Sequence, residues 1–260
     1  MNMVNRHFFN SALTLLFALL IPLLFSSCLQ AARIQVAVAS NFSGPLKYLA
    51  RQFEQHTSHK IIVISGSSGK LYAQIIHGAP YDAFFSADHR RPKLLEQNNL
   101  ALKNTRFTYA IGKLILWSPD PNLINHSSEV LFSRSFQHIA MANPRLAPYG
   151  LAAKQVLQKL ELWESLKNKM VRGENIGQAF QFVKSGNTPL GFVARSQVVT
   201  PSRPLTGSLW EIPDSYYTPI QQQAVQLKDN PVSYEFLAFV QSQAAQKTIQ
   251  SFGYGISHAQ

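Results

Sequence analysis

The chain has 260 residues, of which 46% are hydrophobic and only 14% are charged, and its 24 lysines and arginines against 13 acidic residues give a formal net charge of +11. A chain of this length forms one large domain or two domains of typical size. Its single cysteine excludes a disulfide framework and any zinc or iron–sulfur site built from cysteines. The excess of basic residues is compatible with a nucleic acid, an anionic membrane or a small anion as the binding partner, and it does not distinguish among these three.

The first thirty residues have the pattern of an export signal. Arg6 and His7 precede an apolar run over residues 12–25, and the first acidic residue of the chain is Glu54. A basic start before a short apolar run is typical of a secretory signal, whereas a helix that spans a membrane needs roughly 20 apolar residues. We therefore predict that residues 1–32 are a signal peptide, which is cleaved from an exported chain.

Cys28 stands at the end of this apolar run, in the tetrapeptide FSSC at residues 25–28. The tetrapeptide resembles a bacterial lipobox, in which the cysteine is acylated and becomes the first residue of the mature protein. Phenylalanine occupies the position at which the lipobox usually has leucine, so a second interpretation stays open. In that interpretation the signal is cut near Ala31 or Ala32, and Cys28 is removed with it.

From residue 33 onward, short apolar strands alternate with amphipathic helices. The strands have alternating or continuously apolar residues, and the helices have apolar residues at a spacing of three and four. Such an alternation predicts a mainly parallel sheet with helices on both faces. In the first half, the pattern predicts strands at residues 34–38, 60–64 and 82–86 and helices at about 43–56, 70–78 and 92–99.

The pattern restarts after Tyr109 and continues to the C-terminus. No internal repeat or glycine–serine linker separates the two runs, so two similar lobes with short crossings fit better than one large sheet. We predict two α/β lobes, each a mainly parallel sheet flanked by helices, at residues 33–110 plus 217–260 and at residues 111–216. The second run has predicted strands at residues 114–117, 139–142 and 190–194 and helices at about 151–162, 177–184 and 233–252.

Four loops lie between a strand or a turn and the first residue of a helix, which is where ligands bind in open α/β sheets. They contain Ser40, the serine pair at 67–68, residues 148–150 and residues 175–176. Helix N-termini carry unpaired N–H groups and a partial positive charge, so several of them together suit an anion. Each serine or asparagine taken alone also fits an ordinary helix cap, worth about 1 kcal/mol. Spacing alone does not name the ligand.

Four segments in this order, at residues 36–40, 66–69, 78–88 and 189–191, resemble the periplasmic molybdate-binding proteins of ABC importers. The segment GAPYDAFFSAD at residues 78–88 is the most specific of the four. The resemblance implies a type 2 periplasmic binding protein, or venus flytrap, whose two lobes close on a ligand in the cleft between them. It also implies a periplasmic monomer, without cofactor or enzymatic activity, which captures molybdate or tungstate and delivers it to the permease and ATPase of an ABC transporter.

The family holds its oxyanion with neutral donors rather than with salt bridges or with a metal coordinated by side chains. By the resemblance, its serine hydroxyls fall on Ser40 and Ser68, and its main-chain donors from the second lobe fall on Tyr149 and Ile176. A dianion that leaves water needs donors for its oxygens, because it loses strong hydration. We therefore expect these four residues to bind the ligand, with Ser67 as a further candidate.

Two positions depart from the family's pattern. The family's fifth donor, a tyrosine hydroxyl, falls on Ala194, which has no hydroxyl. This departure implies one fewer hydrogen bond, a replacement from elsewhere in the chain or a different ligand. Lys70 stands where a small or hydroxyl residue is usual, and it either reaches the anion or points into solvent.

Other functions of the same fold also fit the sequence. Tyr216 and Tyr217 resemble the adjacent tyrosines that coordinate iron in ferric-binding proteins, and sulfate or phosphate would suit the same anion loops. A flytrap enzyme such as a dehydratase is a further alternative, although the sequence has no nucleophile elbow, Walker loop or dinucleotide-binding fingerprint. Nucleic acid is not an expected partner, because the chain is exported and its basic residues do not cluster. We expect contact with a membrane only through the permease or through a lipid on Cys28.

Overall fold

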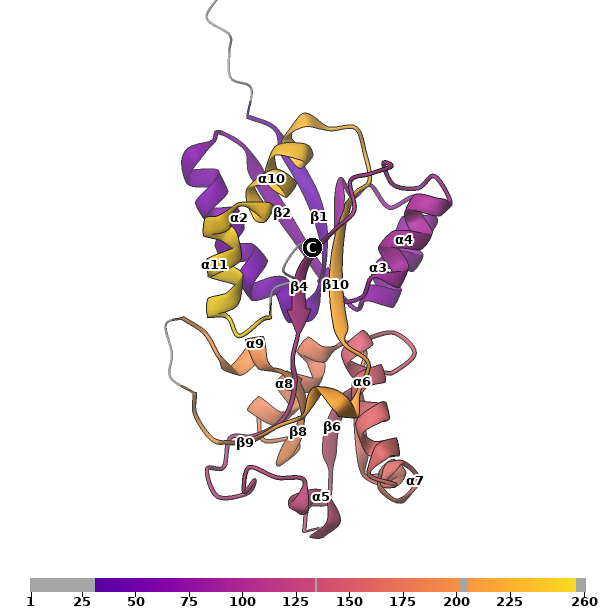
Figure 1. Cartoon of the computed structure of the whole chain (residues 1–260), viewed down its shortest axis with the longest axis vertical. Helices are drawn as coiled ribbons and strands as arrows, with labels where there is room; N and C mark the ends of the chain where they lie inside the picture. The colour runs from indigo at the N-terminus through magenta and orange to yellow at the C-terminus, as the bar shows by residue number, and fades with distance from the viewer. Residues whose placement is uncertain (1–30, 134, 202–204, 256–260) are drawn as a thin grey trace, which may run out of the picture. The chain divides into compact units, whose positions relative to one another are not determined.

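The computed structural model describes residues 31–133, 135–201 and 205–255. Within these ranges the chain forms two five-stranded sheets, each with helices packed against it (Figure 1). Most of the predicted signal peptide, and with it the lipidation candidate Cys28, lies outside the described residues. In the described part of the chain, no helix has the length and apolar character needed to cross a membrane.

The first sheet has the strand order β2-β1-β3-β10-β4. Its strands are β1 (Arg33–Ala39), β2 (Lys60–Gly66), β3 (Ala83–Ser86), β4 (Phe107–Gly112) and β10 (Ile220–Gln226). Successive side chains of a strand point to opposite faces, so Val36 and Val38 of β1 pack on one side and Ala37 on the other. The first side is covered by α2 (Ser43–His56), α10 (Pro231–Gln241) and α11 (Gln243–Ser251), and the second by α3 (Ser68–Ile76) and α4 (Arg90–Gln97), as Figure 1 shows.

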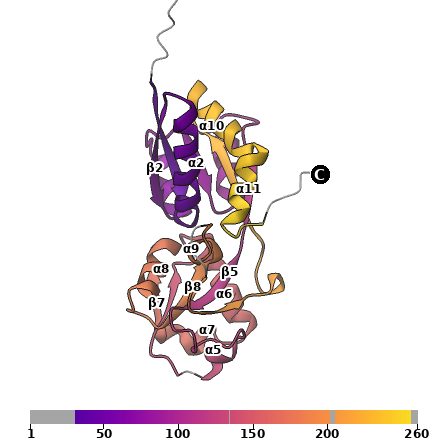
Figure 2. The ribbon, with the colours of Figure 1, turned by 90° about the vertical axis from the view of Figure 1, so that its left-hand side faces the viewer.

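The second sheet has the strand order β7-β6-β8-β5-β9. Its strands are β5 (Leu114–Ser118), β6 (Ile139–Ala142), β7 (Met170–Gly173), β8 (Leu190–Ala194) and β9 (Ser208–Glu211). Its helices are α5 (Glu129–Ser133), α6 (Pro148–Lys159), α7 (Trp163–Leu166), α8 (Ile176–Lys184) and α9 (Arg195–Val198). Leu116 and Met141 pack with α6, whereas Ile115 and Trp117 pack with Val183 of α8. The sheet therefore lies between α6 and α8 (Figure 2).

We call each sheet with its helices a lobe. In the first lobe β1 is parallel to β2 and β3, and β10 is antiparallel to β3 and β4. In the second lobe β6 is parallel to β7 and β8, and β5 is antiparallel to β8 and β9. The predicted two-lobed α/β fold is confirmed, and its sheets are mixed, because one strand in each runs against the other four. The remaining elements are the short 3-10 helices η1 (Ser40–Phe42), η2 (Lys167–Lys169) and η3 (Asp214–Tyr216).

The strand that runs against its neighbours is in each case the one that enters from the other lobe. β4 ends at Gly112 and β5 begins at Leu114, so only Lys113 separates the two sheets, and the return from β9 to β10 runs over residues 212–219. Each lobe turns the carboxyl ends of its parallel strands toward the other lobe (Figure 1). A strand that enters at those ends must run in the opposite direction, which explains β5 and β10. The boundaries that we predict, 33–110 plus 217–260 and 111–216, pass through or beside these two connections, and β4 continues past residue 110 to Gly112.

Candidate functional site

The loops that follow β1, β2 and β3 meet the loops that precede α6 and α8 between the two lobes. They line a partly open cavity of about 10 Å³, close to the volume that one water molecule requires, which we call the interlobe cavity. Of the predicted ligand residues, Ser40, Ser68 and Ile176 line it, and so does Ser67. No charged side chain belongs to its lining in the described part of the chain, which consists of Ala39, Ser40, Asn41, Gly66, Ser67, Ser68, Ala87, Ala147, Pro148, Asn175 and Ile176.

Ser40 follows the last residue of β1 and opens η1, opposite the start of α8. Its Oγ accepts a hydrogen bond of 3.1 Å from the N–H of Gly177. A hydroxyl that accepts through one lone pair keeps its own proton for another acceptor. Ser40 can therefore bond to α8 in the second lobe and donate to a ligand oxygen in the interlobe cavity.

The serine pair joins the start of α3 to the neighbouring loops. Ser67 caps α3, because its side chain accepts from the N–H of Lys70 at 3.3 Å. Ser68 is the first residue of α3, and its Oγ accepts from the N–H of Ala87 at 3.0 Å, just beyond β3. Both serines are buried, with exposures of 2% and 1%. Both hydroxyl protons remain available to a group that enters the cavity, because each oxygen acts as an acceptor in these bonds.

The second lobe presents two helix N-termini to the interlobe cavity. α6 starts at Pro148, which has no N–H, so Tyr149 supplies the first main-chain donor of that helix. α8 starts at Ile176, after Asn175, whose side chain caps the helix by accepting from the N–H of Gln178 at 3.0 Å. Each N-terminus carries a partial positive charge, so two that meet at one cavity favour an anion there.

Tyr149 does not itself line the cavity, although Pro148 before it does. Its side chain is buried in the core of the second lobe, and its hydroxyl accepts from Nε2 of Gln222 at 3.2 Å. Burial, together with the nearby phenols of Tyr254 and Tyr109, raises the pKa of Tyr149 well above its ordinary value. The phenol is therefore neutral and lies in the core, and the main-chain N–H of Tyr149 follows directly after Pro148, which lines the cavity.

Direct contacts join the two lobes beside the cavity. The N–H of Gly69 donates to the carbonyl oxygen of Leu146 at 2.9 Å. Lys70 Nζ forms an ion pair of 3.1 Å with Glu174 in the second lobe, and the two side chains are 53% and 39% exposed. Of the two interpretations of Lys70, the structure therefore supports the one in which this side chain lies at the surface and does not line the cavity.

Ala194 lies at the end of β8 and does not line the interlobe cavity. It is fully buried in the core of the second lobe, and its N–H donates to Oε1 of Gln197 at 2.9 Å. The structure therefore brings neither Ala194 nor Lys70 to the cavity with the serines.

Asn41 is a polar residue of the cavity that the sequence pattern did not predict as a ligand residue. It is 2% exposed, and its Nδ2 donates to Oε1 of Gln222 at 2.8 Å and to the hydroxyl of Tyr254 at 3.0 Å. Its Oδ1 has no hydrogen-bond partner within the described ranges. The available signal was its position directly after Ser40, in a loop that already suited an anion.

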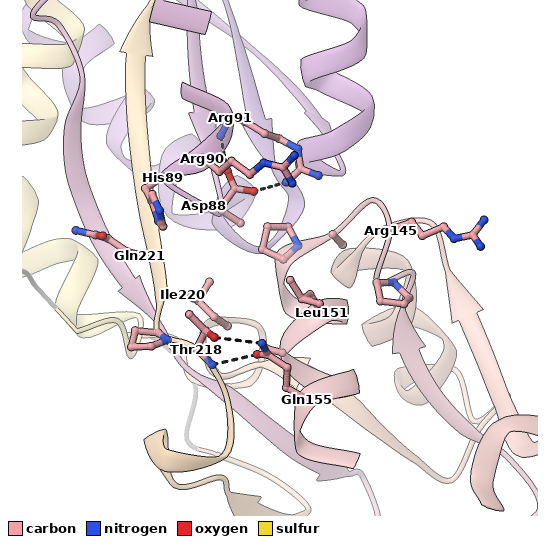
Figure 3. Close-up of a pocket in the computed structure, with 16 residues that line it drawn as sticks. Asp88, His89, Arg90, Arg91, Arg145, Leu151, Gln155, Thr218, Ile220 and Gln221 are labelled. Carbon is pink, nitrogen blue, oxygen red and sulfur yellow. Dashed lines mark hydrogen bonds and ion pairs between the residues drawn. The ribbon is translucent and has the colours of Figure 1, made fainter. Parts of the chain in front are cut away.

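A larger cavity of about 330 Å³ adjoins the interlobe cavity and shares part of its wall. Figure 3 shows Arg90 and Arg91, from the start of α4, on one side of this cavity, whereas Arg145 extends away from it. Arg91 is ion-paired with Asp88. Cationic side chains therefore stand beside the interlobe cavity without entering it, where they contribute a diffuse field that favours the approach of an anion.

Tyr216 and Tyr217 lie outside both cavities. The ring of Tyr216 packs edge-on against Trp210, with ring centroids 5.7 Å apart, and the hydroxyl of Tyr217 accepts from the N–H of Leu114 at 3.2 Å. Burial raises the pKa of Tyr217 to about 12, which disfavours the tyrosinate that iron would require. The described residues also contain no group of three histidine, cysteine or acidic side chains that could hold a metal. The geometry gives the ferric-iron alternative no support.

Comparison with known proteins identifies the relatives of the chain. A model of the family described as bacterial extracellular solute-binding protein matches residues 34–255. The molybdate-binding protein ModA of Azotobacter vinelandii is 45% identical over 236 residues, which cover 90% of this chain and 94% of that protein. ModA of Rhodobacter capsulatus is 41% identical, with coverage of 86% and 88%. The solved structure of the periplasmic molybdate-binding protein of Azotobacter vinelandii matches with a TM-score of 0.84 at 42% identity, over 86% of this chain and 100% of that one.

Proposed function

Because this chain belongs to the family of bacterial extracellular solute-binding proteins, in the group of the ModA molybdate-binding proteins, we propose that it captures molybdate or tungstate in the interlobe cavity. The observation that carries the proposal is the ring of neutral donors at that cavity. Serine hydroxyls from the first lobe face two helix N-termini from the second lobe, and among the residues that the structure describes no charged side chain lines the cavity.

The proposed donors balance the loss of hydration of a dianion. We assign this role to the hydroxyls of Ser40 and Ser68 and to the N–H groups of Tyr149 and Ile176, with Ser67 as a further donor. Hydrogen bonds to a charged acceptor are about twice as strong as bonds between neutral groups, so a few of them replace much of the water lost. The helix N-termini add partial positive charge without burying a full cation. The scheme needs no cofactor.

Lobe movement is part of the proposed mechanism. A cavity of about 10 Å³ holds a water molecule but not a tetrahedral oxyanion, so the lobes must separate slightly to admit the ligand. The lobes then close on the ligand, and contacts beside the cavity, such as the bond from Gly69 to Leu146, form again. The ligand oxygens connect donors of the two lobes, and the crossings at Lys113 and at residues 212–219 act as hinges.

Delivery of the bound oxyanion to a transporter depends on the same closed form of the two lobes. We propose that the chain acts as a periplasmic monomer, and that a permease with its ATPase recognises the surface created when both lobes close on the ligand. Cys28 either tethers the mature chain to a membrane through a lipid or is removed with the signal peptide. Incorporation of labelled palmitate by the wild type, but not by Cys28→Ser, would establish the tether.

Ligand-dependent thermal stability tests the proposed function. The mature chain is heated with no addition and with molybdate, tungstate, sulfate or phosphate at the same ionic strength. At 100 times its dissociation constant, a bound ligand stabilises the folded form by about 2.7 kcal/mol, so molybdate and tungstate should raise the melting temperature by several degrees. Sulfate and phosphate should have little effect. A larger rise in melting temperature with sulfate or phosphate than with molybdate would show that molybdate is not the ligand of this chain.

A further inference from the structure

A buried polar network runs from the interlobe cavity to β10, and Gln222 is at its centre. The side chain of Gln222 is fully buried. Its Oε1 accepts from Nδ2 of Asn41 at 2.8 Å and from the hydroxyl of Tyr109 at 2.9 Å. Its Nε2 donates to the hydroxyl of Tyr149 at 3.2 Å. One amide therefore contacts three polar groups from three different segments, two in the first lobe and one in the second.

Two of these partners are joined directly to the proposed donors. Asn41 follows Ser40 in η1 and lines the interlobe cavity. Tyr149 provides the first N–H of α6. Gln222 thus connects the loop that carries one donor hydroxyl to the residue that carries a donor N–H in the other lobe, although it does not line the cavity itself.

The backbone around Gln222 is adapted to this contact. The register between β10 and β4 shifts between Gln222 and Gln223, and such irregularities re-aim side chains next to functional sites. Gly112, the last residue of β4, stands against the network, and a Cβ on it would overlap both the hydroxyl of Tyr149 and Nε2 of Gln222. The strand irregularity and the absence of a side chain at Gly112 together make room for a polar contact between the lobes. This hydrogen bond constrains the geometry of the contact more than the packing of two apolar side chains would.

We propose that Gln222 is a positioning residue for the oxyanion site. When the lobes close, the Gln222 side chain fixes the first-lobe loop at Asn41 relative to the start of α6 at Tyr149. The inference rests on the proposed function and adds to it a residue outside the cavity. The bond to Tyr149 crosses the lobes, so it stabilises the closed form in particular. Its loss should therefore speed ligand release more than it slows ligand capture.

The experiment compares two buried glutamines of the same strand. Gln222→Met removes the network, whereas Gln226→Met is the matched control, because Gln226 is also buried but its Nε2 donates to the carbonyl oxygens of Lys228 and Asn230, within the first lobe. Both variants should lower the melting temperature of the protein without ligand by a similar amount. Sodium molybdate is titrated calorimetrically into each variant at 25 °C, and its dissociation rate is measured by stopped-flow tryptophan fluorescence.

We expect Gln222→Met to raise the dissociation constant about tenfold, mainly through a faster dissociation rate, and Gln226→Met to change it by less than twofold. Tyr149→Phe, which removes only the contact between the lobes and keeps the ring, should raise it about threefold to tenfold. The effects of Tyr149→Phe and Gln222→Met should be less than additive, because they remove the same bond. Tyr149→Phe also provides the decisive measurement if Gln222→Met does not fold.

The outcomes separate this inference from the proposed function. If the wild type binds molybdate and both Gln222→Met and Tyr149→Phe keep its affinity and dissociation rate, Gln222 has only a structural role and the inference is wrong. If the wild type binds tungstate, sulfate or phosphate in place of molybdate, the same variants are measured with that anion. A tenfold rise in the dissociation constant for Gln222→Met would then support the positioning role, and an unchanged constant would contradict it. If none of the four anions binds, both the proposed function and the inference fail.

Discussion

Replacing Gly69 by alanine tests whether direct contact between the lobes controls the affinity for the ligand. The N–H of Gly69 donates to the carbonyl oxygen of Leu146 at 2.9 Å. A Cβ on Gly69 would stand 2.9 Å from that oxygen and 3.1 Å from Cα of Leu146, both of which belong to backbone and cannot rotate away. The second lobe must therefore move back by roughly half an ångström, which is enough to weaken donors that reach a ligand across the cleft.

The size of the change in the dissociation constant depends on whether the overlap occurs in the closed form or in the open form of the protein. Overpacking of this kind costs about 1–3 kcal/mol. Because only the closed form brings Leu146 against position 69, this free energy is lost from binding, and the dissociation constant for molybdate should rise by about 5-fold to 150-fold. The melting temperature of the protein without ligand should change little, because the lobes can separate to relieve the overlap.

Isothermal calorimetry with molybdate measures the effect, and Gly44→Ala serves as the control. Gly44 lies in the first turn of α2, and a Cβ there would meet nothing within 4 Å. Gly44→Ala should keep the affinity of the wild type and match or exceed its melting temperature, since alanine is the better helix former. If Gly69→Ala bound molybdate within twofold of the wild type, the contact with Leu146 would play no part in the liganded form, and the reasoning would be refuted.

Three further predictions concern single side chains. Ser40→Ala and Ser68→Ala should each raise the dissociation constant for molybdate about tenfold in calorimetry, because each removes a charge-assisted donor, and a change below twofold in both would contradict the assigned donors. Lys70→Ala should change it by less than about fivefold, because the exposed pair with Glu174 contributes only about 0–1 kcal/mol, and a larger loss would instead place Lys70 on the ligand. Tyr217 has a pKa of about 12 in the folded chain against 10.0 ordinarily, so the unfolded chain loses this proton first and stability falls as the pH rises from 10 to 12. Urea midpoints at pH 9 and pH 11 should show this fall, and Tyr217→Phe should lessen it.

The parts of the site that were predictable from the sequence are those fixed by local chemistry. Ser40 and the serine pair follow buried strands and precede helices, so their position at the carboxyl edge of a sheet follows from the alternation of elements. Proline at the start of α6 and asparagine before α8 are standard signals of a helix start. The resemblance to a family then added the kind of ligand, which neither spacing nor composition had named.

The parts that could not be predicted depend on contacts between distant segments. Asn41 and Gln222 are 181 positions apart, and nothing in the local pattern of either residue indicates the other. Lys70 meets Glu174 only because the lobes close, so the sequence could not decide between a ligand contact and the surface. The reversed direction of β5 and β10 likewise depends on where the chain crosses between lobes. A single predicted helix at 233–252 is two helices, because the side chain of Ser242 caps α11 by accepting from the N–H of Ala245.

The place of β10 between β3 and β4 in the first sheet determines the order in which the lobes can be completed during synthesis. β5 to β9 come from one continuous stretch, so the second lobe has all of its strands once Glu211 has emerged. The first lobe starts earlier in the chain, yet β3 and β4 lack a common neighbour until residues 220–226 arrive between them. A chain that emerges from its N-terminus must therefore hold four strands of the first lobe in an unfinished state while the second lobe folds. Such a delay keeps the N-terminal half of the chain incompletely folded, and accessible to chaperones, until translation is nearly complete.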